Sequence, residues 1–533
     1  MESRWARMAS PRLRQGLVTG AAVLSAAVTV LATVYLPGLV RAPGASAAGQ
    51  ASVQPGAAGP NAVPASDVSP ATPSPDPSAQ PSARNVVVLM ADDLDWSTFN
   101  ATEGLSSLRN LGTTLENFTV TDSLCCPSRT SLLRSQYLHN HRVLSNVPRT
   151  GGGWQKFYRL GHPRNCLPTW LSAKGVATAH VGKYLNGFPG TKPPTYVPPG
   201  WDLFQTTVNG HVAYRGYGYE LATNGVVTKP PEFLNDLLTT SAINWMGQAT
   251  EPFYLSFNSY LPHTPFPASP ANTGRNTGAK APRPPSFNVV RAGQPTWLAD
   301  LPALSPAILA DIDRIWARRL DSTQTFADSV QAILKALEEQ GRLDSTLVIV
   351  TSDNGYHLGN HRLATGKQTP FHEDTIVPTV LIGPGIPAGQ TIDQMTSMID
   401  LAPTIANWLG AATPDFVDGR DLLPLVQDPN APWRTGVLTE HYSAPLPGDP
   451  DQDGWDAPPY RSLRTQDWLL VQYQQEWALY NLVRDPYEMT NVIDTTPEAT
   501  LKQLRAQLKA LSKCSGASCR VADRMPAPKA PGA

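Results

Sequence analysis

Two adjacent cysteines stand in a short run that also carries a proline and an arginine. Residues 121–129 read TDSLCCPSR, and Pro127 suits the first turn of a helix. Cys125 is then expected at the helix amino terminus, where partial positive charge attracts anions and lowers a thiol pKa. A disulfide beside a buried thiol is the simpler interpretation. A thiol phosphatase is disfavoured, because Ser131 and Leu132, not arginine, stand six positions after the two cysteines.

Oxygen-bearing side chains follow two apolar, β-branched runs, residues 85–91 (NVVVLMA) and 345–352 (STLVIVTS). Such runs predict strands that are buried on both faces of a parallel sheet. Because ligands collect at the carboxyl ends of these strands, we expect the donors to meet and to bind a hard cation such as Ca²⁺. Each pair alone is equally well explained as a turn or a helix cap. The four donors are Asp92, Asp93, Asp353 and Asn354.

Two further apolar runs end at basic residues. Residues 177–181 (ATAHV) lead to Lys183, and residues 253–257 (FYLSF) lead to His263. A single lysine after a strand is usually a solvated loop residue, and a single histidine is usually structural. Their shared position at predicted strand ends makes Lys183 and His263 candidates for an anion site beside the metal.

The composition limits the class of protein that carries these residues. The chain has 533 residues, of which 41% are hydrophobic and 16% charged, with a net charge of −1. A nucleic-acid-binding protein would carry a marked basic excess, so nucleic acid is excluded as a partner. The length allows about one to three domains.

The amino terminus has the composition of an export signal. Basic residues precede an uncharged run, residues 15–40, and the small residues 45–47 (ASA) offer a cleavage site. The run is also long enough to span a bilayer, so residues 1–47 are predicted to be a signal peptide or a membrane anchor. Residues 48–83, rich in Pro, Ala and Ser, are predicted to be a disordered linker. The protein is therefore expected to be secreted or extracellular, or anchored to the cell membrane by its first segment.

The rest of the chain divides into two predicted parts. The strands above indicate an α/β fold with a large, mostly parallel sheet sandwiched by helices over residues 84–417. Beyond it, residues 469–473 and 477–482 alternate as exposed strands do, and residues 497–513 have leucines at helical spacing. Residues 418–533 are therefore predicted to form a smaller antiparallel sheet with a terminal helix.

The cysteine run resembles the Cys-x-Pro-Ser-Arg signature of type I sulfatases, in which the first cysteine, here Cys125, is oxidised to formylglycine after translation. The likeness extends over nearly all of residues 84–533, and implies the alkaline-phosphatase-like form of the predicted fold. Within the family, the chain most resembles the N-acetylglucosamine-6-sulfatase branch. The other matching motifs are YLHNH (137–141), GKYLN (182–186), PHTP (262–265), APRPPSFN (281–288), TSDNGYHLG (351–359), DLAPT (400–404) and LYNLVRDPYE (479–488).

The resemblance implies a role for each candidate residue. A hydrated aldehyde carries two hydroxyls, so one can attack sulfur while loss of the proton from the other expels sulfate. Ca²⁺ and two lysines would offset the charge on the sulfate oxygens, and a histidine suits proton donation to the leaving oxygen. The implied calcium ligands are Asp92, Asp93, Asp353, Asn354 and the formylglycine at position 125. The other implied catalytic residues are Arg129, which holds the formylglycine oxygen, and Lys183, His263 and Lys367, which contact the sulfate or assist the leaving oxygen.

Two positions depart from the sulfatase pattern. Where the family usually has Leu-Thr-Gly, this chain has Leu133 followed by Arg134-Ser135, a change that bears on cysteine conversion and helix packing. Many sulfatases have a histidine two residues after the catalytic lysine, where this chain has Leu185. The candidates for further substrate contact are Asn186 and His357, of which His357 is more simply explained as structural.

The predicted function is therefore hydrolysis of a sulfate ester, such as that of the sulfated sugar N-acetylglucosamine 6-sulfate, by a sulfuric ester hydrolase. The cofactors would be Ca²⁺ and formylglycine, and a formylglycine-generating enzyme would be a maturation partner. One alternative is a catalytically silent glycan-binding homologue in which Arg134-Ser135 prevents cysteine oxidation. Another is a phosphodiester or phosphonate hydrolase of the same fold.

The five cysteines acquire assignments from the resemblance. If Cys125 becomes the aldehyde, four cysteines remain. Cys514 and Cys519 can close a small loop, which leaves Cys126 and Cys166 as the second predicted disulfide.

Overall fold

The computed structural model describes residues 84–208, 210–442 and 457–532. The predicted leader or anchor, residues 1–47, and the predicted linker, residues 48–83, lie outside the described residues. Within the part of the chain that is described, no helix combines the length and the apolar character needed to cross a bilayer.

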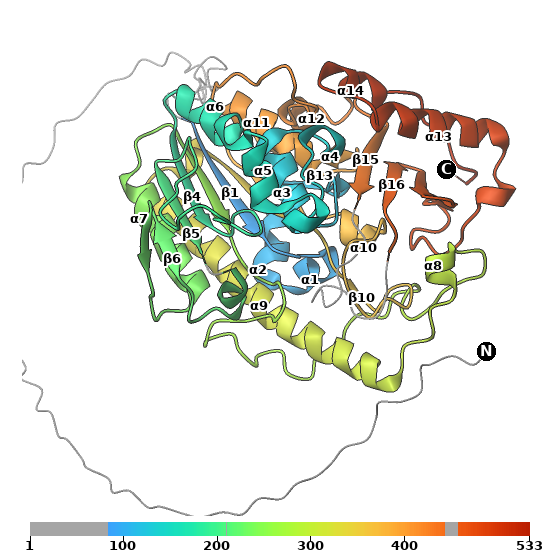
Figure 1. The fold of residues 1–533 in the computed structure, drawn as a ribbon, viewed down its shortest axis with the longest axis horizontal. Helices are drawn as coiled ribbons and strands as arrows, with labels where there is room; N and C mark the ends of the chain where they lie inside the picture. The colour runs from blue at the N-terminus through green and yellow to red at the C-terminus, as the bar shows by residue number, and fades with distance from the viewer. Residues whose placement is uncertain (1–83, 209, 443–456, 533) are drawn as a thin grey trace, which may run out of the picture. The chain divides into compact units, whose positions relative to one another are not determined.

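A ten-stranded mixed sheet forms the centre of the fold (Figure 1). Its four middle strands run parallel in the order β9-β1-β8-β4, and they are the four strands predicted from the apolar runs. The pairing places Ala91 opposite Ser352 and Gly182 opposite Asn258, so the four strands end at the same edge of the sheet. Their bounds are β1 (Asn85–Ala91), β4 (Ala177–Gly182), β8 (Phe253–Asn258) and β9 (Thr346–Ser352).

Helices cover both faces of this sheet (Figure 1). Val86 and Val88 of β1 pack into one apolar core, and Val87 and Leu89 into another, because successive side chains of a strand point to opposite faces. The predicted α/β sandwich is thus confirmed. The first core is closed by α3 (Cys125–Arg134), α5 (Gly153–Arg159), α6 (Leu167–Ala173) and α11 (Leu401–Trp408). The second is closed by α1 (Trp96–Ala101), α2 (Glu103–Ser106), α7 (Leu234–Gln248) and α9 (Pro306–Glu339).

Shorter elements extend and connect this framework. On one side the sheet continues with β12 (Val380–Ile382), β2 (Thr113–Leu115) and β13 (Gln390–Ile392). On the other it continues with β5 (Leu203–Thr207), β6 (Leu221–Thr223) and β7 (Val226–Thr228). Two small ladders pair β10 (His357–Leu358) with β11 (Thr365–Gly366) and β14 (Thr396–Ser397) with β3 (Phe118–Thr119). The short helices are α4 (Leu138–His141), α8 (Thr296–Ala299), α10 (His372–Thr375) and α12 (Leu423–Gln427).

A separate four-stranded antiparallel sheet lies toward the carboxyl terminus. Leu501, Leu504 and Leu508 of helix α13 pack against it, and their spacing is the pattern that predicts this helix. The small sheet with a terminal helix is therefore confirmed, while the boundary after residue 417 stays a prediction. The elements are β15 (Gly436–His441), β16 (Tyr460–Thr465), β17 (Trp468–Tyr473), β18 (Trp477–Asn481), α13 (Glu498–Leu511) and α14 (Ala517–Ala522).

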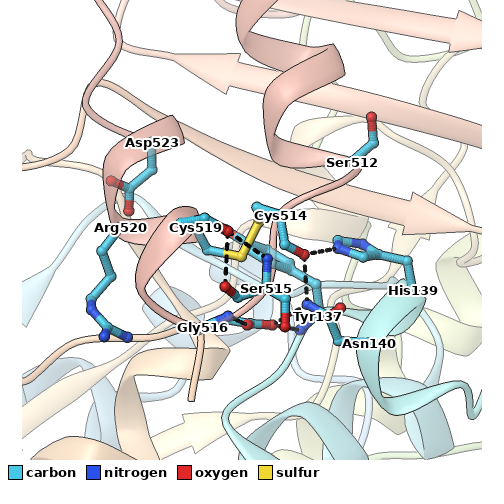
Figure 2. Close-up of a disulfide and its surroundings, with 12 residues drawn as sticks. Tyr137, His139, Asn140, Ser512, Cys514, Ser515, Gly516, Cys519, Arg520 and Asp523 are labelled. Atoms are coloured by element: carbon cyan, nitrogen blue, oxygen red, sulfur yellow. Dashed lines mark hydrogen bonds between the residues drawn. A yellow bond between two sulfur atoms is a disulfide. The ribbon is translucent and has the colours of Figure 1, made fainter. Parts of the chain in front are cut away.

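The structure contains the predicted disulfide between Cys514, in the turn after α13, and Cys519 of α14 (Figure 2). The carbonyl oxygen of Cys514 lies 2.9 Å from Nε2 of His139 and accepts a hydrogen bond of 3.0 Å from Nδ2 of Asn140. The backbone of the same loop donates to Oδ1 of Asp418 at 2.7 Å. The disulfide therefore braces a loop that is bound to α4, the short helix that follows α3.

The predicted disulfide between Cys126 and Cys166 is wrong, because both residues are free, buried thiols. The thiol of Cys126, in the first turn of α3, lies against the backbone of Gly153 and Asn186. Sγ of Cys166 instead lies 3.7 Å from the carbonyl oxygen of Pro163, before α6. Burial raises the pKa of both thiols to about 12, so both stay protonated. Free cysteines are among the most buried residue types, and these two pack as small apolar side chains.

Thiol labelling tests this arrangement. We expect iodoacetamide to modify Cys126 and Cys166, but neither Cys514 nor Cys519, when the protein is denatured without a reductant, because only the second pair is cross-linked. Peptide mapping by mass spectrometry measures the modification. A sample reduced before labelling is the control and should react at all four positions. Protection of Cys126 and Cys166 in the unreduced sample would contradict the structure.

Candidate active site

Side chains from the ends of two neighbouring strands meet the start of a helix at one buried point. Asp92 and Asp93 follow β1, Asp353 follows β9, and Cys125 begins α3. One potential ligand atom from each of these four residues lies within 4.8 Å of the others, and all four residues are buried. The structure thus brings together residues that are far apart in the sequence, at the edge where parallel strands end.

Asn354 adds a further oxygen to this group. Its Nδ2 donates a hydrogen bond of 2.7 Å to Oδ1 of Asp93. Oδ1 of Asn354 and Oδ2 of Asp93 are buried and have no hydrogen-bond partner among the described residues. Such oxygens are costly to bury unless a cation or a donor binds them. Three carboxylates and an amide oxygen form a donor set that fits a hard divalent cation such as Ca²⁺.

Two lysines balance the carboxylates that follow β1. Nζ of Lys183, after β4, lies 2.6 Å from Oδ2 of Asp92. Nζ of Lys367, after β11, lies 2.6 Å from Oδ1 of Asp93. Burial would by itself lower the pKa of Lys183, but the combined attraction of Asp92, Cys125 and Tyr214 raises that pKa well above its usual value. Lys183 is therefore a permanent cation in this buried site.

Arg129 connects the end of β9 to the end of β8. Its Nε donates to Oδ2 of Asp353 at 2.7 Å, and its Nη1 donates to Oδ1 of Asn258 at 3.0 Å. Although burial opposes the effect, Arg129 and the two lysines lower the pKa of Asp353. Nη2 of Arg129 is buried and has no hydrogen-bond partner among the described residues, so it can bind an anion. Sequence reasoning missed Asn258, because an asparagine that ends a strand has the same pattern as a turn residue.

Cys125 lies at the amino terminus of α3, as predicted. Its Sγ lies 3.0 Å from Nζ of Lys367 and 3.6 Å from Oδ1 of Asp92. The expected lowering of the thiol pKa is wrong, because burial raises it well above its usual value despite the nearby lysines. A protonated thiol is a weak nucleophile. The position suits a nucleophile, but the unmodified side chain does not.

The Arg134-Ser135 departure lies where α3 ends. Ser135 has a φ of 51°, a left-handed conformation that favours glycine. Its Oγ donates to the carbonyl oxygen of Ile399 at 2.5 Å, which offsets part of this cost. The Arg134 guanidinium lies 4.0 Å from the ring centre of Phe416 and donates to the side chain of Gln136 at 2.9 Å. Both residues thus have specific contacts at an ordinary helix end.

His263 lies on the turn after β8, beside a tyrosine that the sequence did not single out. Its Nδ1 lies 2.7 Å from the carbonyl oxygen of Thr264, so Nδ1 carries a hydrogen and Nε2 is the second reactive atom. Nε2 lies 3.8 Å from Oδ2 of Asp93. The ring of Tyr214 lies against the imidazole, with 4.2 Å between the ring centres. Tyr214 was missed because it lies between β5 and β6, outside every motif and predicted strand end.

Arg319 of α9 is a third residue that sequence reasoning missed. Asp93 has a φ of 69°, which is rare for a residue other than glycine. Nη2 of Arg319 donates to the carbonyl oxygen of Asp93 at 2.6 Å and to Oδ2 of Asp95 at 2.7 Å. This fully buried arginine therefore holds the turn that directs Asp93 into the site. An arginine inside a long amphipathic helix gives no sequence signal for burial, since most lie in solvent.

The two candidates for substrate contact differ in how their side chains are bound. Nδ1 of His357 lies 3.0 Å from both carboxylate oxygens of Asp374, which also accepts hydrogen bonds from Thr369. His357 thus supports the loop that carries Lys367. The backbone carbonyl of Asn186 accepts a hydrogen bond of 2.8 Å from the start of α5, whereas its side-chain Oδ1 is buried and has no hydrogen-bond partner among the described residues.

The arrangement has the parts needed for displacement at an oxyanion. A nucleophile position stands beside Arg129, Lys183 and Lys367, which can hold a tetrahedral anion and offset charge that develops on its oxygens. Nε2 of His263 is placed to give a proton to a departing oxygen. The oxygen cluster provides a place for a divalent cation on the same anion.

Comparisons with known proteins agree with this geometry. Residues 84–411 match the Sulfatase family, and residues 359–514 match the family described as N-sulphoglucosamine sulphohydrolase, C-terminal. The chain is 30% identical to human N-acetylglucosamine-6-sulfatase over 481 residues, covering 82% of this chain and 86% of the relative. It is also 30% identical to an arylsulfatase of Chlamydomonas reinhardtii, covering 82% and 75%.

Solved structures share the fold at lower identity. A protein solved in complex with its substrate D-glucosamine-2-N,6-O-disulfate aligns with a TM-score of 0.68 and 20% identity, covering 83% of this chain and 99% of that one. A phosphonate monoester hydrolase of Agrobacterium radiobacter aligns with a TM-score of 0.61 and 20% identity, covering 80% and 96%. The Sulfatase match spans more than half of the chain, and the alignment covers 86% of the human relative. This chain therefore belongs to the sulfatase family and is a sulfuric ester hydrolase with the alkaline-phosphatase-like fold.

Proposed function

We propose that the enzyme hydrolyses the 6-sulfate ester of N-acetylglucosamine or of a closely related sulfated amino sugar, with formylglycine at position 125 and Ca²⁺. The observation that carries this proposal is the setting of Cys125, at a helix amino terminus between Lys367 and Asp92, within the sulfatase signature. The choice of sugar is supported by the identity to N-acetylglucosamine-6-sulfatase and by the ligand in the structural relative.

The chemistry of the thiol favours its conversion. Burial keeps Cys125 protonated, so as a cysteine it would attack a sulfate ester poorly. Formylglycine, once formed and hydrated, would supply a hydroxyl nucleophile and a second hydroxyl through which sulfate can be released. Conversion needs a formylglycine-generating enzyme as a partner.

The oxygen cluster is the proposed calcium site. The two buried oxygens without a donor, on Asp93 and Asn354, support this assignment. Bound Ca²⁺ would help to neutralise the sulfate oxygens and orient the nucleophile. The proposed ligands are Asp92, Asp93, Asp353, Asn354 and the side chain at position 125.

The basic residues have complementary proposed roles. Lys183 and Lys367 hold the sulfate oxygens, and Arg129 holds the nucleophilic side chain through Nη2. His263, with Nδ1–H directed at the Thr264 carbonyl, presents Nε2 to the leaving sugar oxygen and donates a proton to it. An alkoxide is a poor leaving group, so this proton is needed for a sugar substrate.

Export of the enzyme is part of the proposal. The chain is 30% identical over 388 residues to a Caenorhabditis elegans protein named as a putative extracellular sulfatase, covering 68% of this chain and 53% of that relative. The Cys514–Cys519 disulfide suits an oxidising compartment. The amino-terminal segment would then serve as a cleaved signal or as a membrane anchor.

Mass spectrometry of the peptide that contains Cys125 tests the nucleophile. When the chain is produced together with a formylglycine-generating enzyme, we expect the aldehyde at position 125 and sulfate-ester turnover that follows the converted fraction. Cys125→Ala should be folded and inactive. Turnover by protein with a wholly unmodified thiol would refute the proposal, and an unmodified, inactive protein would favour the silent glycan-binding alternative.

Removal of the metal tests the oxygen cluster. We expect EDTA to abolish turnover and Ca²⁺ to restore it, because the carboxylates then have a cation to share again. Asp93→Asn should weaken Ca²⁺ binding by at least about 10-fold in calorimetry, since it removes one charged ligand. The exposed Asp311→Asn on α9 is the matched control and should bind normally. Full activity in EDTA would exclude the metal assignment.

Substitution of Lys183 tests the sulfate site. We expect Lys183→Ala to lower kcat on sulfate esters by about 10²–10³-fold, because a buried cation that stabilises the transition state is lost. The exposed Lys174→Ala should retain wild-type rates. Wild-type turnover should also be faster on 4-nitrophenyl sulfate than on bis(4-nitrophenyl) phosphate. The reverse order would assign the site to phosphodiesters.

A further inference from the structure

Tyr214 contacts both His263, the proposed proton donor, and Lys183, which is proposed to hold the sulfate. It belongs to the 3₁₀ helix η4 (Gly210–Arg215), between β5 and β6. Its ring centre lies 4.2 Å from that of His263 and 5.4 Å from Nζ of Lys183. One aromatic ring therefore contacts the imidazole after β8 and the ammonium group after β4.

The Tyr214 ring contacts a face of the His263 imidazole, and Nε2 of His263 points toward Asp93 of the site. The planes of the two rings are inclined by only 31°, so the phenol covers a face of the imidazole and not its edge. Nδ1 is occupied by the Thr264 carbonyl at 2.7 Å, and Nε2 is directed toward Asp93 at 3.8 Å. The backbone contact fixes one edge of the imidazole, and Tyr214 limits its rotation out of this plane.

A second tyrosine, Tyr260, packs against Tyr214. The ring of Tyr214 meets that of Tyr260 edge to face, with centres 5.3 Å apart and an angle of 82°. The hydroxyl of Tyr260 lies 2.6 Å from Oγ1 of Thr207, at the end of β5. The position of the Tyr214 ring thus follows from the central sheet, and the ring transmits that position to His263.

The electrostatics of the ring suit this place. The face of a phenol ring is negative and attracts cations within about 6 Å. Lys183 is such a cation, with its Nζ 5.4 Å from the centre of the Tyr214 ring. A neutral aliphatic side chain of similar size would fill the space but would offer neither a flat contact nor this attraction.

We propose that Tyr214 is a positioning residue for the hydrolytic reaction, which holds the His263 imidazole in line with the leaving oxygen and keeps Lys183 beside the sulfate. This inference rests on the proposed function, because it assigns His263 as proton donor. It predicts that removal of the Tyr214 ring lowers kcat more as the leaving group becomes more basic, since only a basic leaving oxygen needs the proton.

The test compares kcat for 4-nitrophenyl sulfate and phenyl sulfate, whose phenolate is the more basic leaving group. We expect Tyr214→Leu to lower kcat on phenyl sulfate by on the order of 10-fold or more, and on 4-nitrophenyl sulfate by less than about 3-fold. Tyr214→Phe keeps the ring and should stay within about 2-fold of wild type on both substrates. Tyr214→Gln is a second ring-free variant and should repeat the selective loss if Tyr214→Leu does not fold.

The matched control is Tyr217→Leu, three residues further along, whose side chain is 45% exposed and packs on Phe233. It should behave as wild type. Equal losses on the two substrates in Tyr214→Leu, or no loss, would overturn the role of Tyr214 while leaving the proposed function intact. A fully converted wild-type enzyme that hydrolyses neither the aryl sulfates nor N-acetylglucosamine 6-sulfate would instead overturn the proposed function and this inference with it.

Discussion

Charge balance in a buried interior is the constraint on which this site depends. Asp92, Asp93 and Asp353 are buried together, and an unpaired carboxylate removed from water is strongly destabilising. Each is paired with a buried cation, and the cations are Arg129, Lys183 and Lys367. These come from α3, from the end of β4 and from the loop after β11, so the sheet, the nucleophile helix and that loop must assemble together. Nη2 of Arg129, which has no hydrogen-bond partner among the described residues, then leaves the site able to bind an anion.

The small carboxyl-terminal sheet supports the catalytic framework directly. Nδ1 of His441, on β15, lies 2.9 Å from Oδ1 of Asp122, three residues before Cys125. The hydroxyl of Ser123 donates to the carbonyl oxygen of Thr369 at 3.0 Å, close to Lys367 in the chain. The residues just before the nucleophile are therefore held by the small sheet and by the loop that carries Lys367.

The sequence was informative where chemistry and secondary structure share one pattern. The apolar runs before Asp92, Asp353 and Lys183 predict strands, and parallel strands that end together must bring those side chains to one edge. The leucine spacing of α13 likewise predicts both a helix and the side of that helix that packs into the core. The pairing of Cys126 with Cys166 failed because it was assigned by elimination, and elimination carries no information on distance. The thiol pKa of Cys125 was misjudged because the helix terminus is visible in the sequence but its burial is not.

The sequence by itself determined the parallel strands, the nucleophile helix, the oxygen donors and the sulfatase signature, because each is a local pattern of residue type and spacing. The tertiary structure alone decided that Arg319 holds Asp93, that Asn258 binds Arg129 and that Tyr214 covers His263. These contacts join residues that are separated by many tens of positions in the chain. Their side chains become specific only when packing removes water and leaves each polar or aromatic group the few partners that the fold brings to it.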